Sequence, residues 1–313
     1  MRIVFMGTPD FSVGALNSLV EAGHEVCACV TQPDKPKGRG KAVLMTPVKE
    51  RAMELQIPVY QPVKVRDPEF QEILKSLAPD VIVVVAFGQL IPQSVLDLPP
   101  YGCINIHASL LPKYRGAAPI QWVIIDGEKE TGITTMMMEA GLDTGDMLEK
   151  TVIPIEEDET GGSLHDKLRA AGGTLIVSTL KKLEEGTLTR TKQTEEGTCY
   201  AKKLTKSLGD IDWTMEAAAI ERLIRALNPW PSAYTSLEGR TIKLWKAQVL
   251  NEEYEGVCGQ VIKAEKDNLI VKAGKGALKI TELQAEGKKR MDTGAFLRGF
   301  SIKEGALFER RAQ

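Results

Sequence analysis

The chain has 313 residues, of which 43% are hydrophobic and 26% are charged, and its formal net charge is -2. This composition is typical of a globular protein long enough for two domains, and it gives no overall electrostatic attraction to nucleic acid or to a membrane. No apolar run approaches the roughly 20 residues of a membrane span, and the N-terminal apolar run is too short for a signal peptide, so we expect a cytoplasmic protein. The five cysteines lack CxxC spacing, which favours free thiols over a metal site or a disulfide framework.

The first part of the sequence alternates short apolar runs with helical patterns. Residues 2–6 form an apolar run, and Thr8-Pro9-Asp10 then has the pattern of a helix start, with Thr8 as the N-cap. Residues 80–88 form a continuous apolar run between turn signals, typical of a central parallel strand buried on both faces. Further strands are expected at 103–106, 132–138 and 147–155, and a long helix at 162–185. This alternation predicts an α/β domain over residues 1–189, with a doubly wound, Rossmann-like parallel sheet.

The segment at residues 33–41, PDKPKGRGK, is polar and rich in Gly and Pro. It lacks the GxxxxGK[ST] spacing of a P-loop, and GxGxxG is absent after the first strand, which argues against a dinucleotide site. Two interpretations stay open, a solvated loop or a basic loop that contacts phosphates. The candidate phosphate contacts are Lys35, Lys37, Arg39 and Lys41.

The pattern changes after Gly186. Residues 190–206 are irregular and basic, which predicts an interdomain linker. Residues 207–313 contain a helical pattern at 214–227 and then five short strands, typical of a small antiparallel OB-like β-barrel. Basic residues of the linker and the barrel favour nucleic-acid binding, although a solvated charged face fits them equally well. The candidate cations are Lys202, Lys203, Lys206, Lys288, Lys289 and Arg290.

One stretch, residues 102–146, holds the only grouping of side chains that suits catalysis. Asn105 and His107 are two positions apart on one predicted strand, so their side chains point to the same side. Asp143 follows a later strand in a Gly-rich loop, which lets the backbone approach a ligand closely. An amide and an imidazolium can stabilise an oxyanion, and a carboxylate can support the imidazolium and help to move a proton. The three residues therefore suit acyl transfer.

Ser109 raises the alternative of a Ser–His–Asp hydrolase. No G-x-S-x-G elbow surrounds it, and the run Ser109-Leu110-Leu111-Pro112 is a poor setting for an exposed nucleophile. From spacing alone, a purely structural role also stays open, in which the Asn105 and His107 side chains have their hydrogen bonds satisfied inside a core.

The run at residues 105–120, NIHASLLPKYRGAAPI, resembles the signature of the 10-formyltetrahydrofolate-dependent formyltransferases. The run GLDTGD at 141–146 matches their second motif. The start FMGTP at 5–9, the loop at 33–41 and AEGKKRM at 285–291 narrow the resemblance to the members that formylate methionyl-tRNA. The resemblance covers essentially the whole chain.

This resemblance implies transfer of a formyl group from N10 of 10-formyltetrahydrofolate, the co-substrate, to the α-amino group of methionine on initiator tRNA. Asn105 and His107 would hold the formyl oxygen, and Asp143 would support His107 and the proton transfer. The basic loop, the linker lysines and the barrel would contact the tRNA, and no metal site is implied. The expected folate contacts are Phe87, Gly88, Gln89, Leu90, Ser109, Leu110, Leu111, Pro112 and Leu142.

Three rival functions remain at this stage: a formyltransferase that acts on a small amine, a folate hydrolase, and a non-catalytic RNA-binding protein. The sequence shows no obvious surface for self-association, so we expect a monomer, and we expect no membrane partner.

Overall fold

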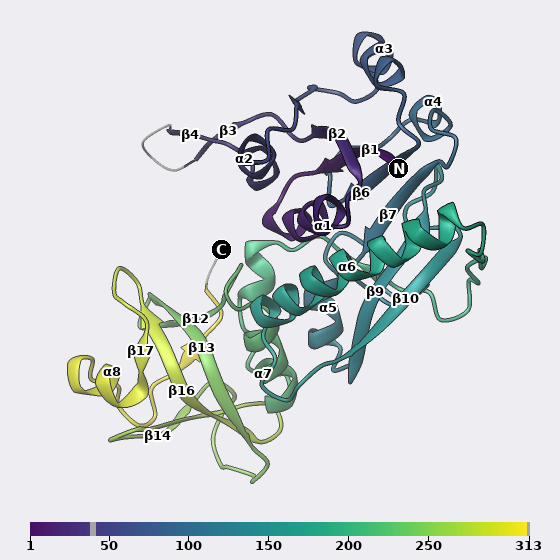
Figure 1. Ribbon diagram of the computed structural model, residues 1–313. Helices are drawn as coiled ribbons and strands as arrows, with labels where there is room; N and C mark the ends of the chain where they lie inside the picture. Colours follow the sequence, from purple (N-terminus) through teal and green to yellow (C-terminus); the bar gives the residue numbers. More distant parts are fainter. Residues whose placement is uncertain (38–41, 312–313) are drawn as a thin grey trace. The chain divides into compact units, whose positions relative to one another are not determined.

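The computed structural model describes residues 1–37 and 42–311 (Figure 1). The chain folds into two compact units, and residues 190–206, the predicted linker, are divided between them after Ala201. No helix in the described ranges is both long and apolar enough to cross a lipid bilayer. The first unit consists of Met1–Gly116, Glu130–Pro154 and His165–Ala201, and the second of Ala117–Lys129, Ile155–Leu164 and Lys202–Gln313.

A seven-stranded sheet runs through the first unit in the order β10-β9-β7-β6-β1-β2-β5. Its central strand β6 is buried along its whole length, as the continuous apolar run predicts. The neighbouring strands of the group from β7 to β5 pair in parallel, which confirms the predicted doubly wound core. These strands are β1 (Arg2–Gly7), β2 (Glu25–Val30), β5 (Val59–Tyr60), β6 (Val81–Val85) and β7 (Cys103–His107).

One edge of this sheet is antiparallel, which the sequence analysis did not foresee. β9 (Glu130–Met137) runs antiparallel to β7, and β10 (Met147–Pro154) runs antiparallel to β9. The physical reason for the β9–β10 pair is its connection, because residues 138–146 join these two strands directly, whereas a parallel pair needs a crossover of a dozen or more residues, usually a helix. This short connection contains Asp143.

The helices of the first unit cover the sheet. The long helix α6 (Gly161–Glu184) packs across β7 and β9, where Gly172 faces Ile106 and Ile133 (Figure 1). The other helices are α1 (Asp10–Glu21), α2 (Pro47–Glu54), α3 (Pro68–Leu77) and the short α4 (Gln93–Leu96).

The start of α1 differs from the expected capping pattern. The helix begins at Asp10, so the N-cap position belongs to Pro9, and Thr8 does not cap it. The Thr8 hydroxyl donates instead to the carbonyl of Phe87 at 2.8 Å. A hydroxyl can satisfy either a helix end or a neighbouring strand end, and here the tertiary partner prevails over the local one.

The basic segment at residues 33–41 lies partly outside the described residues. A short antiparallel pair joins β3 (Lys35–Lys37) to β4 (Ala42–Leu44), and Lys35 is exposed. Arg39 and Lys41 lie outside the described ranges. Asp34, the residue before β3, forms an ion pair with Lys49, with 2.5 Å between the carboxylate oxygen Oδ2 and Nζ.

The second unit contains an antiparallel, curled sheet in the order β14-β15-β16-β13-β12-β18, with β17 paired to β16. This confirms the predicted antiparallel second domain. Alternate residues of β13 and β16, such as Leu244 and Ile280, are fully buried in its core. The strands are β12 (Ala233–Leu237), β13 (Arg240–Leu250), β14 (Val261–Glu265), β15 (Asn268–Lys272), β16 (Ala277–Ala285), β17 (Met291–Asp292) and β18 (Phe308–Glu309).

Helix α7 (Ala217–Ala226) packs against β13 and also against α5 (Pro119–Ile125), a helix from the first half of the sequence. The Arg222 side chain of α7 donates from Nε to the carbonyl of Ile125 at 3.0 Å. The remaining helix of this unit, α8 (Thr293–Gly299), lies beside β16. The segment at 117–129 is therefore an integral part of the second unit.

We predict that Gly132→Ala destabilises the first unit. An added Cβ at Gly132 would lie 2.0 Å from the carbonyl oxygen of Thr151 and 2.6 Å from Leu110, so the β9–β10 pair would have to shift. Overpacking of this kind costs about 1–3 kcal/mol in the free energy of unfolding, measurable by urea denaturation. Gly299→Ala is the control, because no heavy atom lies within 4 Å of that added Cβ. Equal stability losses in both variants would contradict the prediction.

Candidate active site

The structure brings the predicted catalytic residues together at the end of β7. Asn105 and His107 lie on β7, and Asp143 lies in the connection between β9 and β10. The Nδ1 atom of His107 lies 3.8 Å from Oδ2 of Asp143, and both side chains are largely buried. Burial strengthens the electrostatic interaction between a carboxylate and a protonated ring, because water screens it less.

One hydrogen bond sets the orientation of the His107 ring. Its Nε2 atom lies 2.8 Å from the carbonyl oxygen of Tyr114. A carbonyl oxygen only accepts, so Nε2 carries a proton and donates it. Nδ1 is then the nitrogen that can gain or lose a proton, and it is the nitrogen that faces Asp143. At 3.8 Å the pair lies beyond direct hydrogen-bond distance, so the contact is an ion pair when the ring is protonated.

Asp143 is held by backbone geometry and by a main-chain donor. Its φ is 53°, in the left-handed region that non-glycine residues rarely adopt. The N–H of Gly116 donates to its Oδ2 at 2.8 Å, so the carboxylate atom that faces His107 also receives a hydrogen bond. Gly145 allows the loop to close, because a Cβ there would lie 1.9 Å from the carbonyl oxygen of Met137.

Asn105 differs from these two residues because its amide is not engaged. It is partly buried, and among residues 1–37 and 42–311 it has no hydrogen-bond partner for its side chain. An amide offers two donors and one acceptor. The Asn105 amide is therefore available to a ligand beside the His107 ring.

The sequence predicts folate contacts in the segment after β6, at residues 87–90. The Phe87 ring is buried in the core, and its carbonyl accepts from the Thr8 hydroxyl. The Gln89 side chain is used structurally, since it accepts from the N–H of Val65 at 2.7 Å and donates to another main-chain carbonyl. Gly88 is exposed, and Leu90 is 90% exposed.

The second predicted folate segment, residues 109–112, is mostly buried. Ser109 is fully buried, and its hydroxyl donates to the carbonyl of Lys113 at 2.6 Å. This hydroxyl is not paired with His107, so a Ser–His–Asp hydrolase arrangement is absent. Leu111 is buried as well, whereas Leu110 and Pro112 are half-buried. The remaining predicted contact, Leu142, is 58% exposed in the loop that carries Asp143.

Thr134 of β9 holds the main chain of this second segment by hydrogen bonds. Its buried hydroxyl donates to the carbonyl of Ser109 at 2.7 Å and accepts from the N–H of Leu111 at 3.1 Å. The Lys150 ammonium donates to the carbonyl of Leu111, and burial lowers the pKa of Lys150. The main chain that follows His107 is thus held at several points.

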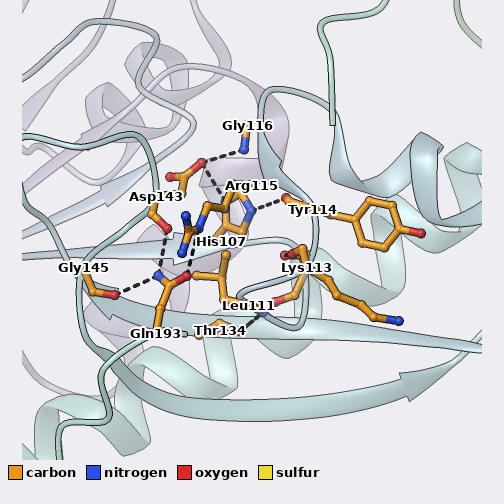
Figure 2. A network of polar contacts seen from close by, with 11 residues as sticks. His107, Leu111, Lys113, Tyr114, Arg115, Gly116, Thr134, Asp143, Gly145 and Gln193 are labelled. Atoms are coloured by element: carbon orange, nitrogen blue, oxygen red, sulfur yellow. Dashed lines mark hydrogen bonds and ion pairs between the residues drawn. The ribbon is translucent and has the colours of Figure 1, made fainter. Parts of the chain in front are cut away.

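Sequence reasoning missed two further residues of this network, which Figure 2 shows. Arg115 is 2% exposed, and its Nε donates to Oε1 of Gln193 at 3.0 Å. Gln193 donates from Nε2 to the carbonyl of Asp143 and to the carbonyl of Gly145, each at 2.8 Å. Arg115 stands inside the recognised signature, but Gln193 comes 50 residues after Asp143, in the predicted linker. No local pattern distinguishes it from the polar residues around it.

The predicted basic contacts of the second unit fall into two groups. Lys202, Lys203 and Lys206 are exposed, and so are Lys288 and Lys289. Arg290 is engaged: it forms a two-point ion pair with Glu282, and its guanidinium lies 4.9 Å from the ring centre of Trp245. Within the described part of the chain, no group of three or more His, Cys, Asp and Glu side chains is arranged to hold a metal ion.

Comparisons with known proteins match both units. Residues 1–180 match the formyl transferase family, and residues 203–301 match the formyl transferase C-terminal domain. A methionyl-tRNA formyltransferase of Agathobacter rectalis is 56% identical over 310 residues, which are 98% of this chain and 99% of that protein. Proteins of the same name from Geobacter sulfurreducens and Clostridioides difficile are 53% and 52% identical over 97% and 98% of this chain, and over 96% and 99% of their own.

Two solved structures show the same fold at low sequence identity. WlaRD, a sugar 3N-formyl transferase crystallised with dTDP and 5-N-formyl-THF, has a TM-score of 0.66. Its sequence is 19% identical, over 92% of this chain and 99% of that one. HypX from Aquifex aeolicus in complex with tetrahydrofolic acid has a TM-score of 0.64 and 20% identity over 99% of this chain. The match spans 51% of the HypX chain.

We predict that Thr134→Val destabilises the site without changing its volume. The valine keeps the shape of threonine but leaves the Ser109 carbonyl and the Leu111 N–H without their buried partner. Unsatisfied buried groups of this kind cost about 1–3 kcal/mol, measurable as a lower free energy of unfolding in urea. Thr174→Val is the matched control, because that threonine is exposed on α6. The prediction is wrong when the two variants are equally stable.

Proposed function

The chain belongs to the formyl transferase family, and from that membership we propose the reaction that it performs. It transfers the formyl group of 10-formyltetrahydrofolate to the α-amino group of methionine on initiator methionyl-tRNA. The observation that carries this assignment is the near full-length identity, at 52–56%, to proteins named methionyl-tRNA formyltransferase. The formylated methionyl-tRNA then serves translation initiation.

The chemistry defines what the site has to supply. The α-amino nitrogen forms a bond with the formyl carbon, and the bond between that carbon and N10 breaks. The formyl oxygen is negatively charged in the tetrahedral intermediate, so donors aimed at it lower the barrier. The amine loses one proton and N10 gains one, and the products are tetrahydrofolate and formylmethionyl-tRNA. The site therefore needs oxyanion donors and a group that carries a proton.

We assign these roles to Asn105 and His107 of β7 and to Asp143 of the connection between β9 and β10. The Asn105 amide, which has no partner among the described residues, would donate to the formyl oxygen. The His107 ring would assist through Nδ1, because Nε2 is held by the Tyr114 carbonyl. Asp143, 3.8 Å from Nδ1, would stabilise the ring in its protonated form and so support the transfer of the proton.

The folate would be bound by the segments that flank these residues. Leu90 and Leu142 are large apolar side chains left exposed, which suits contact with the flat ring of the co-substrate. The backbone at Phe87 and Gly88 would contribute polar main-chain atoms. Ser109 and Leu111 are buried, so we assign to their side chains the support of the wall formed with Leu110 and Pro112.

The tRNA would be bound through exposed cations of the second unit, chiefly Lys202, Lys203 and Lys206, together with Lys288 and Lys289. Among these positions the described residues offer no ion-pair partner, so their charges are available to phosphates. Arg290, Lys35, Lys37, Arg39 and Lys41 stay predictions from the sequence. A monomer that works in the cytoplasm is likewise a prediction from the sequence.

The direct test of this function is a formylation assay with charged initiator tRNA and 10-formyltetrahydrofolate. We expect formylmethionyl-tRNA to form together with an equal amount of tetrahydrofolate. Two results would contradict the assignment: formate release without an acceptor, which indicates a folate hydrolase, or formylation of small amines in preference to the charged tRNA.

We predict that His107→Ala and Asn105→Ala impair turnover while leaving the fold intact. Loss of one oxyanion donor, as in Asn105→Ala, should lower kcat by about 100- to 1,000-fold. His107→Ala should lower it by at least about 100-fold, because it removes the proton carrier too. The measurements are steady-state kinetics with charged tRNA. His165→Ala is the control, since that histidine is paired with Asp166 on α6, outside the site. A kcat near the wild-type value in His107→Ala would falsify the mechanism.

A further prediction concerns two exposed lysines of the second unit, Lys202 and Lys203. The double variant Lys202→Gln with Lys203→Gln should weaken tRNA binding and reduce the slope of log Kd against log salt by about 1.5, because two phosphate contacts no longer release counterions. The matched control is Lys75→Gln with Lys181→Gln, two exposed lysines of the first unit that pair with Glu72 and Glu185. An unchanged slope in the Lys202→Gln, Lys203→Gln variant would show that these lysines do not contact phosphates and belong to an ordinary solvated surface.

A further inference from the structure

Residues 191–201, here named the strap, contact both loops that surround His107. At its beginning, Thr191 exchanges two main-chain hydrogen bonds with Met147, at 2.8 and 2.9 Å. At its end, β11 (Tyr200–Ala201) pairs in parallel with β8 (Arg115–Gly116). The strap therefore spans from the strand that follows Asp143 to the segment that follows Tyr114.

Cys199 of the strap holds the segment that carries the Tyr114 carbonyl, which is the hydrogen-bond partner of His107 Nε2. The Cys199 sulfur accepts from the N–H of Tyr114 at 3.2 Å, and the Cys199 carbonyl accepts from the N–H of Arg115 at 3.0 Å. The carbonyl of Tyr114 is the group that orients the His107 ring. One end of the strap thus fixes the peptide on which the imidazole depends.

The strap holds the carboxylate loop through Gln193. The two N–H bonds of the Gln193 amide are both used, one on the carbonyl of Asp143 and one on the carbonyl of Gly145, each at 2.8 Å (Figure 2). Its oxygen accepts from Nε of Arg115 at 3.0 Å. These partners allow one amide orientation only, since the reverse would set its oxygen against two carbonyl oxygens.

Arg115 fixes the oxygen end of the Gln193 amide. Its side chain is 2% exposed, and its second contact is Glu195 of the strap at 3.4 Å. A buried guanidinium is strongly restricted, because it must satisfy its donors inside the protein. Both ends of the Gln193 amide are therefore fixed, one by a buried cation and the other by the Asp143 loop.

We propose that Gln193 is a positioning residue that sets the carboxylate of Asp143 against His107. Asp143 has a φ of 53°, a conformation that persists only where the surroundings impose it. Gln193 clamps the two carbonyls on either side of Thr144 and so imposes it. Gln193 reaches the reacting atoms only through Asp143. This proposal deepens the proposed function and rests on it.

The first test is Gln193→Met, which keeps the length of the side chain and removes its hydrogen bonds. Because small misplacements of catalytic groups cost up to about 100-fold in rate, we expect kcat for formyl transfer to fall about 10- to 100-fold. KM for 10-formyltetrahydrofolate and for methionyl-tRNA should change less than about 3-fold, since ground-state binding is not removed. Thr194→Val is the matched control, because it lies next in the strap, is exposed and does not contact the Asp143 loop.

A second readout does not depend on activity. The N–H of Gly116 donates to Asp143, so displacement of the carboxylate should speed amide hydrogen exchange at Gly116. We expect Gln193→Met to raise exchange there, by mass spectrometry of peptides, and Thr194→Val to leave it at the wild-type level. If the wild-type protein does not formylate methionyl-tRNA, the proposed function fails, and this exchange measurement alone still decides whether Gln193 positions Asp143.

The variant Gln193→Glu separates positioning from a general loss of stability and serves if the Met variant does not fold. A carboxylate there keeps the bond to Arg115 but faces two carbonyl oxygens, and protonation returns one donor. Its kcat relative to the wild type should therefore rise as the pH is lowered, whereas that of Gln193→Met should stay constant. Unchanged exchange at Gly116, wild-type kcat in Gln193→Met, a change confined to KM, or a kcat ratio in Gln193→Glu that does not vary with pH would each overturn the proposal.

Discussion

The hydrogen bond from Nε2 of His107 to the carbonyl of Tyr114 is the constraint on which the site depends. A carbonyl accepts and never donates, so this bond fixes both the tautomer and the plane of the ring. It leaves Nδ1, which carries no hydrogen in the neutral ring, on the side of Asp143. The strand β7 places the ring, but the direction of its reactive nitrogen is set by a main-chain atom seven residues later.

Much of this site follows from the sequence because its core is local. Asn105 and His107 lie on one face of a strand through simple alternation, and the buried run at 80–88 identifies the neighbouring strand. The position of Asp143 beside His107 also follows, once its motif is recognised. The antiparallel edge formed by β9 and β10 did not follow, although the short connection between them requires these two strands to be antiparallel to each other. Apolar runs show where strands are and carry no information on direction.

The supporting network could not be predicted, because its contacts are long-range and end on main-chain carbonyls. Gln193 binds the carbonyls of Asp143 and Gly145, and a carbonyl has no residue type by which a sequence pattern could reveal it. Thr8 shows the same limit, since a threonine before Pro-Asp fits an N-cap equally well and is used instead on the carbonyl of Phe87. Hydrogen bonds from a side chain to a distant backbone decide both cases.

The signature at residues 105–120 has a structural meaning beyond catalysis. Its first part, to Gly116, belongs to the first unit, and the rest belongs to the second, where α5 packs against α7. Val123 and Ile124 of α5 are each 1% exposed, so α5 is a core element there. A chain ended near residue 206 would keep α5 and lose α7, which would expose this apolar surface to water. The second unit is therefore not a detachable addition to the first, because the signature that begins in the first unit contributes a helix to the core of the second.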